Sequence, residues 1–379
     1  MHDTYILHIA SWYPHEESPY EGDFVDRHIR CISTQVCGIV YFGKAVNKPI
    51  VKMQISNYEN CKVYKRLFQR AGSLSNYSKY HALANQDINT IIKDHGVPLA
   101  IHCHAGFPGL SLSSALAKNY RIPLIFTEHS TIYQQEKLSI KEKLIFWHLN
   151  KYISKADVVC PVSLAHSESI SAKCSVNKID VIPNVVTNPF FETLLKKSPS
   201  PSKLLHISSL DNDQKNITDL LKGFNILKNK RPDVSLTLVG NSNITLVKRL
   251  IKRHKIDLLD IKIIGPLEHT AIPKLMTEHD LFVLWSRYES FSLVIAESWA
   301  SGLPVLCNES GGITAENNEA LGHLSKNYTP EGLADDIDRT LNRYDEFDIT
   351  EIRAYAQKRY SEVSIAQKFG DLYNSLSIL

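Results

Sequence analysis

Short apolar segments alternate with longer segments of helical periodicity along most of the chain. The short segments favour β-strands, because they are apolar throughout and rich in β-branched residues. They span residues 5–10, 38–42, 100–104, 124–127, 158–162 and 180–182, and then 203–208, 235–239, 261–264, 281–284 and 304–306. The spacing of apolar positions predicts helices over residues 26–36, 80–95, 110–120, 140–154, 216–228, 244–254 and 292–301. Apolar strands that alternate with helices predict parallel sheets covered on both faces, which is an α/β fold.

The alternation falls into two blocks, which predict two Rossmann-like, doubly wound domains of similar size. Between them, residues 187–202 are rich in proline, serine and lysine, a composition typical of a linker. The first domain is predicted over residues 1–186 and the second over residues 203–360. Residues 361–379 are predicted to form a helix that crosses back to the first domain. Two facing sheets would place their ligand-binding edges on a shared central cleft.

The composition is that of an ordinary folded protein. Hydrophobic residues make up 43% of the 379 residues and charged residues 22%, which excludes a disordered chain. The net charge of +3 is too small to indicate nucleic-acid binding. Seven cysteines without a C-x-x-C pair argue against a disulfide framework or a zinc ribbon. The first apolar run is too short for a secretory signal and no run is long enough to span a membrane, so we expect a cytoplasmic protein.

The strongest chemical signal lies between Ser286 and Glu297, where a predicted strand is followed by a predicted helix. Four residues form the expected helix start: Ser290, Phe291, Ser292 and Leu293. Its unpaired N–H groups and positive dipole end suit a diphosphate. The carboxylate of Glu297 on the helix is suited to ribose hydroxyls, and that of Glu289 in the loop to hydroxyls of a sugar. The spacing of the two glutamates alone is also compatible with solvated or helix-capping side chains.

The surroundings of these glutamates resemble the E-x(7)-E motif of retaining family-four glycosyltransferases, which have the two-domain GT-B fold. The likeness continues through residues 298–304 (SWASGLP) and through Gly311 and Gly312. Ser292 stands where the family usually has glycine. Other landmarks of the family follow in the same order, so the resemblance extends over essentially the whole chain.

Four further segments carry the resemblance. Residues 21–28 (EGDFVDRH) resemble the element whose glycine, Gly22 here, lets the backbone approach the donor phosphates and the acceptor. Residues 127–129 resemble the T-E-H element, in which His129 would contact the donor sugar. Residues 181–186 resemble the I-P-N-G-V element, in which Asn184 would support the cleft between the domains. Residues 210–215 resemble the diphosphate-binding loop, where Lys215 matches the family's lysine and Ser209 stands in place of its arginine.

The resemblance implies a retaining transferase that moves a hexose or N-acetylhexosamine from a nucleotide-diphosphate sugar to an acceptor hydroxyl. A UDP-sugar is favoured over GDP-mannose, and the acceptor is expected to be a saccharide or lipid-linked saccharide in cell-surface polysaccharide or glycan synthesis. The second domain would bind the donor and the first the acceptor. His129, Lys215 and Glu289 would act at the reacting centre, and no cofactor or metal ion is expected. The donor would contact Gly22, Asn184, Ser209, Lys215, Ser290, Phe291, Ser292, Leu293 and Glu297.

Two other classes of function remain open at this point. One is a different sugar-nucleotide enzyme on the same fold, such as an epimerase or a phosphorylase. The other is a non-catalytic carbohydrate-binding relative that kept the fold and lost the activity.

Two polar constellations have plainer interpretations. His102 and His104 form an H-x-H pair, but no third ligand is evident nearby, so strand-end packing with hydrogen bonds is favoured over a metal site. Asp211 and Asp213 form a D-x-D pattern, for which a solvated turn is favoured over a metal site.

The helical segment 140–154 combines apolar positions with Lys141, Lys143 and Lys151. One interpretation is a core helix with a solvated charged face. The other is a peripheral contact with anionic lipid at the inner face of the membrane, which would carry a lipid-linked acceptor. The basic segment 62–70 lies where acceptor loops often occur in the resembled family.

Overall fold

The structure is a computed structural model that describes residues 4–48, 53–193, 196–240, 244–257 and 260–378. The chain divides into two compact units, which we call the first and second units. The first unit consists of Met1–Val185 and Glu362–Leu379, and the second of Val186–Ser361. Residues 187–202, predicted as a linker, begin the second unit with the short helix α6 (Asn188–Glu192). Residues 194–195 of that segment lie outside the described residues.

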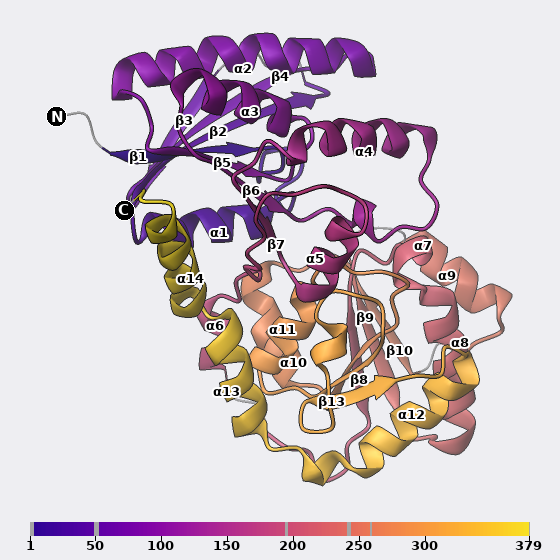
Figure 1. Cartoon of the computed structure of the whole chain (residues 1–379). Helices are drawn as coiled ribbons and strands as arrows, with labels where there is room; N and C mark the ends of the chain where they lie inside the picture. The colour runs from indigo at the N-terminus through magenta and orange to yellow at the C-terminus, as the bar shows by residue number, and fades with distance from the viewer. Residues whose placement is uncertain (1–3, 49–52, 194–195, 241–243, 258–259, 379) are drawn as a thin grey trace. The chain divides into compact units, whose positions relative to one another are not determined.

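A seven-stranded sheet forms the centre of the first unit (Figure 1). Its strands, in spatial order, are β3 (Met53–Tyr58), β4 (Cys61–Gln69), β2 (Cys37–Val46), β1 (Tyr5–Ala10), β5 (Ala100–His104), β6 (Leu124–Glu128) and β7 (Val158–Pro161). The pairs from β4 to β7 are parallel, and β3 is antiparallel to β4. The order reverses between β1 and β5, so the loops that follow these two strands separate at a topological switch point.

Helices cover both faces of this sheet (Figure 1). On one face lie α2 (Ser73–His95), α3 (Gly109–Tyr120) and α4 (Ile140–Ile153), and on the other lie α1 (Asp23–Ser33) and α14 (Glu362–Ser375). Leu112 of α3 belongs to the same buried cluster as Leu7, whereas Phe369 of α14 belongs to that of Ile6. The strands β1, β5, β6 and β7 are buried at every position because helices cover both faces of the sheet. The short helix α5 (Leu164–Ser171) follows β7, and the 3-10 turn η1 (Thr131–Tyr133) follows β6.

A six-stranded parallel sheet forms the centre of the second unit. Its strands, in spatial order, are β10 (Ile261–Ile264), β9 (Ser235–Val239), β8 (Lys203–Ile207), β11 (Leu281–Leu284), β12 (Val305–Asn308) and β13 (Gly322–Ser325). Its helices are α7 (Asn212–Lys215), α8 (Ile217–Lys230), α9 (Ile244–Arg253), α10 (Ile272–Thr277), α11 (Leu293–Ala300), α12 (Pro330–Asn342) and α13 (Ile349–Tyr360). Three 3-10 turns are η2 (His269–Ala271), η3 (Thr314–Glu316) and η4 (Tyr344–Glu346). Leu220 of α8, Val247 of α9 and Leu333 of α12 share one buried cluster with the strands.

The predicted α/β class, with two Rossmann-like domains built on parallel sheets, is confirmed. Residues 180–182 are not a strand, because the chain there makes only an isolated bridge between Ile179 and Val159. The basic segment 62–70 lies mostly in β4 rather than in a loop, and α2 begins at Ser73 rather than at residue 80. The strands β3 and β4 escaped sequence reasoning because polar residues interrupt their apolar positions. Among the described residues, no helix combines the length and the apolar composition needed to cross a bilayer.

Candidate functional site

Three loops meet at the carboxyl edge of the second sheet, following β8, β11 and β12. The strand order reverses between β8 and β11, which is where doubly wound sheets bind ligands. The loops after β11 and β12 are joined by backbone hydrogen bonds. The amide of Glu289 donates to the carbonyl of Ser310 at 2.6 Å, and the amide of Ile313 donates to the carbonyl of Phe291 at 2.9 Å. The loop that carries the predicted motif therefore follows a fixed path.

Two consecutive glycines allow the loop after β12 to pack closely against the loop after β11. Gly311 and Gly312 have φ values of 85° and 62°. A Cβ on Gly311 would lie 2.8 Å from the carbonyl oxygen of Glu289, and one on Gly312 would lie 2.5 Å from that of Phe291. Both the backbone conformation and the lack of space favour glycine here.

Lys215 and Glu289 form an ion pair in the second unit. The Lys215 Nζ lies 2.6 Å from Glu289 Oε1, and the two side chains are 14% and 6% exposed. Lys215 ends α7, whose first amides are capped by Asp211: its Oδ1 accepts hydrogen bonds from the amides of Asp213 and Gln214. The D-x-D segment is therefore a capped helix start and not the solvated turn that we expected.

Arg287 fastens α7 to the loop after β11, a role that sequence reasoning missed. Its guanidinium donates to the carbonyl of Asn212 and to Oδ1 of Asn216, each at 2.7 Å. Its amide donates to the carbonyl of Gln214 at 2.7 Å. Arg287 thus contacts the helix that carries Lys215 at three points. The signal was present in the sequence, since Arg287 lies inside the glutamate motif, but no spacing rule connects it to a segment more than 70 residues earlier.

Glu297 lies in the first turns of α11 and pairs with His269 of η2. The Glu297 Oε1 lies 2.8 Å from His269 Nε2, and the side chain of Glu297 is only 4% exposed. The helix begins after Ser292, which has a left-handed backbone (φ 74°, ψ 74°) and makes no side-chain cap. The side chain of Phe291 is buried beside the ring of Tyr360, so only its backbone is available to a ligand.

Three further residues predicted at this edge are partly buried: Ser209, Ser290 and Leu293, which is the first residue of α11. Ser209 is partly buried, and its Oγ accepts a hydrogen bond from the amide of Asp211 at 3.4 Å. Ser290 is partly buried in the loop before α11. The second unit thus contains Ser209, Lys215, Glu289, Ser290, Phe291, Ser292, Leu293 and Glu297 of the predicted site.

The first unit brings together the other three predicted residues: Gly22, His129 and Asn184. Gly22 has a φ of 70° and precedes α1, and a Cβ there would lie 2.4 Å from the backbone carbon of Trp12. Two residues later, the ring of Phe24 lies 4.7 Å from the ring of His129. Burial lowers the pKa of His129 well below its usual value, and the neighbouring side chain of Asn184 acts in the opposite direction. His129 is therefore a neutral ring at pH 7.

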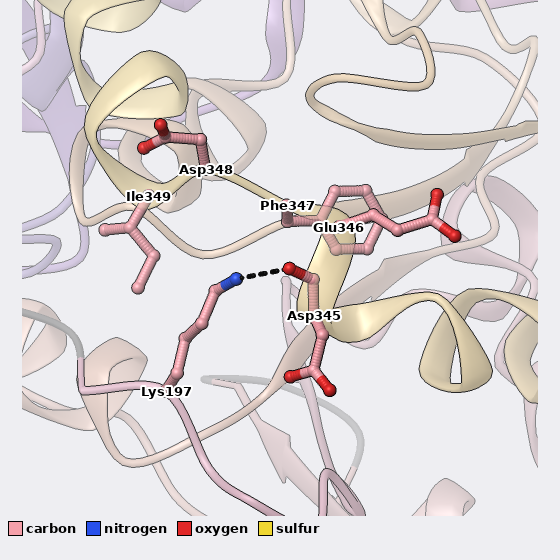
Figure 2. Close-up of a pocket in the computed structure, with 6 residues that line it drawn as sticks. All are labelled: Lys197, Asp345, Glu346, Phe347, Asp348 and Ile349. Atoms are coloured by element: carbon pink, nitrogen blue, oxygen red, sulfur yellow. Dashed lines mark hydrogen bonds between the residues drawn. The ribbon is translucent and has the colours of Figure 1, made fainter.

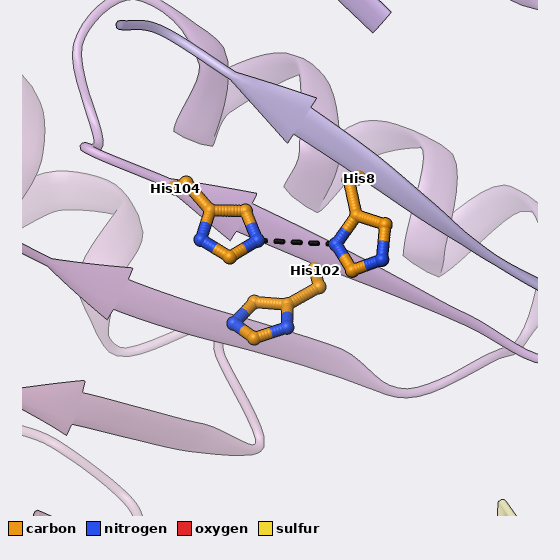
Figure 3. A group of neighbouring side chains, drawn as sticks. All are labelled: His8, His102 and His104. Carbon is orange, nitrogen blue, oxygen red and sulfur yellow. Dashed lines mark hydrogen bonds between the residues drawn. The ribbon is translucent and has the colours of Figure 1, made fainter. Parts of the chain in front are cut away.

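A group of buried histidines lies next to His129. His8, His102 and His104 have ring nitrogens within 4.8 Å of one another (Figure 3), and His28, His104 and His129 form a second such group. The expectation that no third histidine accompanies His102 and His104 is wrong, because β1 pairs with β5 and places His8 beside them.

The rings of this group form hydrogen bonds with one another or with nearby hydroxyl groups. His8 Nδ1 lies 3.1 Å from His104 Nε2. His102 uses both nitrogens, with Tyr373 Oη at 2.8 Å and Thr127 Oγ1 at 2.7 Å. Burial lowers the pKa of His8 to about 3 and holds those of His102 and His104 well below their usual value. These contacts support the packing and hydrogen-bonding interpretation, although neutral imidazoles are also the form that ligates metal ions.

Glu128 fixes the backbone on which His129 stands. Its Oε1 accepts hydrogen bonds from the amides of His129 and Ser130 at 2.8 and 2.9 Å. Burial raises the pKa of Glu128 to about 7, while these amides act in the opposite direction. In the T-E-H element, the side chain of Glu128 thus shapes the loop that carries the buried ring of His129.

A hollow of about 440 Å³ in the second unit lies elsewhere (Figure 2). The described residues that line it come from η4, the start of α13 and Lys197, whose Nζ donates to the carbonyl of Asp345 at 2.9 Å. None of the predicted site residues is among them. The loops at the sheet edge remain the better candidate.

Comparison with known proteins gives a consistent result. Residues 191–359 match the family model of glycosyl transferases group 1, and residues 62–187 match that of glycosyltransferase family 4. An uncharacterized 41.2 kDa protein in the cps region of Klebsiella pneumoniae is 23% identical, over 82% of this chain and 87% of its own length. The putative teichuronic acid biosynthesis glycosyltransferase TuaC of Bacillus subtilis is 22% identical, over 88% of each chain.

Solved structures show the same fold. Sucrose-phosphate synthase from Thermosynechococcus elongatus matches with a TM-score of 0.80 at 17% identity, over 99% of both chains. HepE from Anabaena, solved with UDP and glucose, matches with a TM-score of 0.72 at 19% identity, over 98% of this chain and 99% of that one. The predicted GT-B fold is thereby confirmed.

Proposed function

The chain belongs to the glycosyl transferases of group 1, and on that premise we propose that it is a retaining enzyme using a nucleotide-diphosphate sugar. It would transfer a hexose or N-acetylhexosamine from the donor to an acceptor hydroxyl. The observation that carries the proposal is the Lys215–Glu289 ion pair at the switch point of the second sheet, in which Glu289 is buried and Lys215 is partly buried. A cation and a carboxylate held together at a ligand-binding edge suit a diphosphate and a sugar hydroxyl, respectively.

In this proposal, the second unit neutralises the leaving group. The diphosphate takes Lys215 away from Glu289 and lies at the start of α11, where unpaired amides and the helix dipole favour negative charge. Charge on the diphosphate grows as the bond to the sugar breaks, so a fixed cation stabilises the transition state more than the bound donor. In this proposal the cation and the helix dipole take the place of a divalent ion.

Two carboxylates and one histidine would then orient the donor. The carboxylate of Glu297 accepts hydrogen bonds from the hydroxyls of the ribose, and these bonds replace its contact with His269. Glu289, released from Lys215, accepts hydroxyls of the sugar. His129, neutral and supported by Asn184, donates or accepts one hydrogen bond to the sugar near the reacting carbon.

The donor and the acceptor are proposed by class. We favour a UDP-sugar, and HepE, which has the same fold and was solved with UDP and glucose, supports this choice. An acceptor in cell-surface polysaccharide or lipid-linked glycan synthesis is supported by the relative in a cps region and by TuaC, which is named for teichuronic acid biosynthesis.

Nucleotide binding by the purified protein tests the proposal. UDP, GDP, ADP, CMP and dTDP are compared by thermal shift, with and without EDTA, since a ligand of the folded state raises the melting temperature. We expect a rise with UDP that EDTA leaves unchanged and that Lys215→Ala reduces. Lys222→Ala, which removes a half-exposed lysine of α8, is the matched control. No rise with any nucleotide in a folded sample would contradict the transferase and favour a non-catalytic relative.

A further inference from the structure

Helix α4 of the first unit carries apolar residues on two opposite faces. Its inner face buries His148, Leu149 and Ile153. Its outer face presents Ile140, Leu144 and Trp147, which are 81%, 65% and 64% exposed. Their spacing of four and three residues places them in one stripe along the helix. The outer face of a surface helix is ordinarily polar, so this stripe needs a partner.

The stripe is held in place by the inner face of the helix and by its start. Ser139 and Glu142 form a capping box, in which each side chain accepts a hydrogen bond from the other's backbone amide. The ring of His148 lies 5.3 Å from Phe107 and 5.7 Å from Tyr77 of α2. The exposed residues are therefore presented on a helix that is already folded and anchored.

Lysines surround the stripe. Lys137, Lys141, Lys143 and Lys151 are exposed, and Lys151 Nζ lies 5.5 Å from the centre of the Trp147 ring. The acidic residues in the same segment are Glu136 and Glu142, so residues 136–151 carry a net charge of 4 − 2 = +2. Glu142 is also engaged in the cap. The face that α4 presents is apolar in the middle and basic around it.

We propose that the outer face of α4 docks onto the surface of an anionic lipid bilayer. The helix would lie in the plane of the interface, with Ile140, Leu144 and Trp147 entering the acyl boundary. Indole rings favour that depth, and the lysine stems reach back to the lipid phosphates. The proposal concerns binding only and does not depend on the reaction proposed above.

Charge distinguishes a bilayer from a second copy of the chain. Two copies packed through α4 would bring lysines of one helix against lysines of the other, and like charges in contact disfavour such an interface. An anionic surface instead attracts every lysine around the stripe. Apolar contact and charge therefore both favour lipid.

Flotation of the full chain with vesicles tests the proposal. We expect the protein to float with vesicles that contain phosphatidylglycerol, to float much less with pure phosphatidylcholine, and to be released by salt. The double substitution Leu144→Glu/Trp147→Glu should lower binding by at least about tenfold. Lys141→Glu/Lys143→Glu should lower it on anionic vesicles by about fivefold or more per lysine.

The controls separate lipid binding from misfolding and from self-association. Val363→Glu on α14 changes another exposed apolar residue, 80% exposed in the same unit, and should bind vesicles like the unchanged protein. The emission of Trp147 should shift to shorter wavelength on binding, and Trp12→Phe should keep that shift. Equal flotation of the Leu144→Glu/Trp147→Glu protein would overturn the proposal. A dimer that depends on Trp147, in a protein that does not float, would also overturn it.

Discussion

Ser292 is a serine in a backbone conformation that favours glycine. Its φ of 74° places it in the left-handed region, and its buried Oγ has no hydrogen-bond partner among the described residues. This is also the position at which the resembled family usually has glycine. The left-handed conformation costs a non-glycine residue roughly 1–2 kcal/mol, against up to about 1 kcal/mol for the entropy of glycine.

We therefore expect Ser292→Gly to stabilise the second unit by up to about 1 kcal/mol. The melting temperature, measured by calorimetry, should rise by roughly 2–4 °C. Ser301→Gly is the matched control, since Ser301 has a right-handed backbone (φ −79°) and glycine relieves nothing there. A lower melting temperature for Ser292→Gly would mean that the serine makes a contact worth more than the strain.

Glu297 is buried and pairs with His269, a contact that is proposed to give way to the ribose of the donor. Glu297→Gln keeps the shape but removes the charge, so the hydrogen bonds to hydroxyls should weaken. We expect the dissociation constant of UDP, measured by calorimetric titration, to rise by about tenfold or more, because hydrogen bonds to a charged group contribute roughly 1.5–3 kcal/mol.

His269→Ala serves as the comparison for this change. It removes the partner and leaves the carboxylate, so its effect on UDP binding should be smaller than that of Glu297→Gln. If His269→Ala weakened binding as much as Glu297→Gln did, the histidine and not the carboxylate would be the group that meets the nucleotide.

At the scale of elements, α7 is too short to position Lys215 by itself. A helix of four residues has little intrinsic stability, and this one depends on the Asp211 cap and on the contacts of Arg287. Arg287→Ala should therefore let Lys215 move without removing its charge. We expect the rate of transfer to fall more than donor affinity, because the cation is needed most in the transition state.

Two variants make this prediction specific. Arg287→Lys keeps the charge but not the planar fork that reaches two acceptors, so it should rescue little activity. Arg339→Ala removes an exposed arginine of α12 in the same unit and should leave the rate unchanged. Full rescue by lysine would indicate that only the charge of Arg287 matters, and not its hold on α7.

Most of the strands that the sequence predicts best are buried on both sides. The buried strands β1, β5, β9 and β11 have the predicted bounds, since continuous apolar runs have no other favourable place. The edge strand β10, which is mostly not buried, also has the predicted bounds. The contacts of individual side chains were harder to predict from the sequence. Lys215 and Glu289 could be assigned to one edge from the strand order, but their direct pairing depends on the path of two loops. His8 lies beside His102 because of the register of β1 with β5, which the sequence alone does not show.

At the scale of the whole molecule, the two units differ in how many neutral histidines they bury. Eight histidines of the first unit have a lowered pKa, and burial is the main cause for each: His8, His28, His81, His102, His104, His129, His148 and His166. In the second unit the described histidines with a lowered pKa are His206 and His279. The first unit should therefore be the more sensitive to acid.

The direction of this dependence follows from proton binding. Below pH 6.5 the histidines of the unfolded chain bind protons and the buried ones do not, so the free energy of unfolding falls as the pH falls. Each fully buried histidine contributes about 1.4 kcal/mol for each pH unit in that range. Glu128 acts in the opposite direction, because its pKa is raised to about 7, but it is a single group.

We therefore expect the first unit to unfold before the second when the pH is lowered from 7 to 5.5. The described tryptophans allow a test, because Trp285 and Trp299 are buried in the second unit, whereas Trp12 and Trp147 belong to the first.

In the Trp12→Phe/Trp147→Phe protein, fluorescence follows the second unit and circular dichroism follows both. At pH 7 the two signals give reference urea midpoints. At pH 5.5 the dichroism should show an earlier transition, while the fluorescence midpoint moves little. If both signals moved together by the same amount, the buried histidines would not govern the acid stability of the first unit, or the two units would unfold as one.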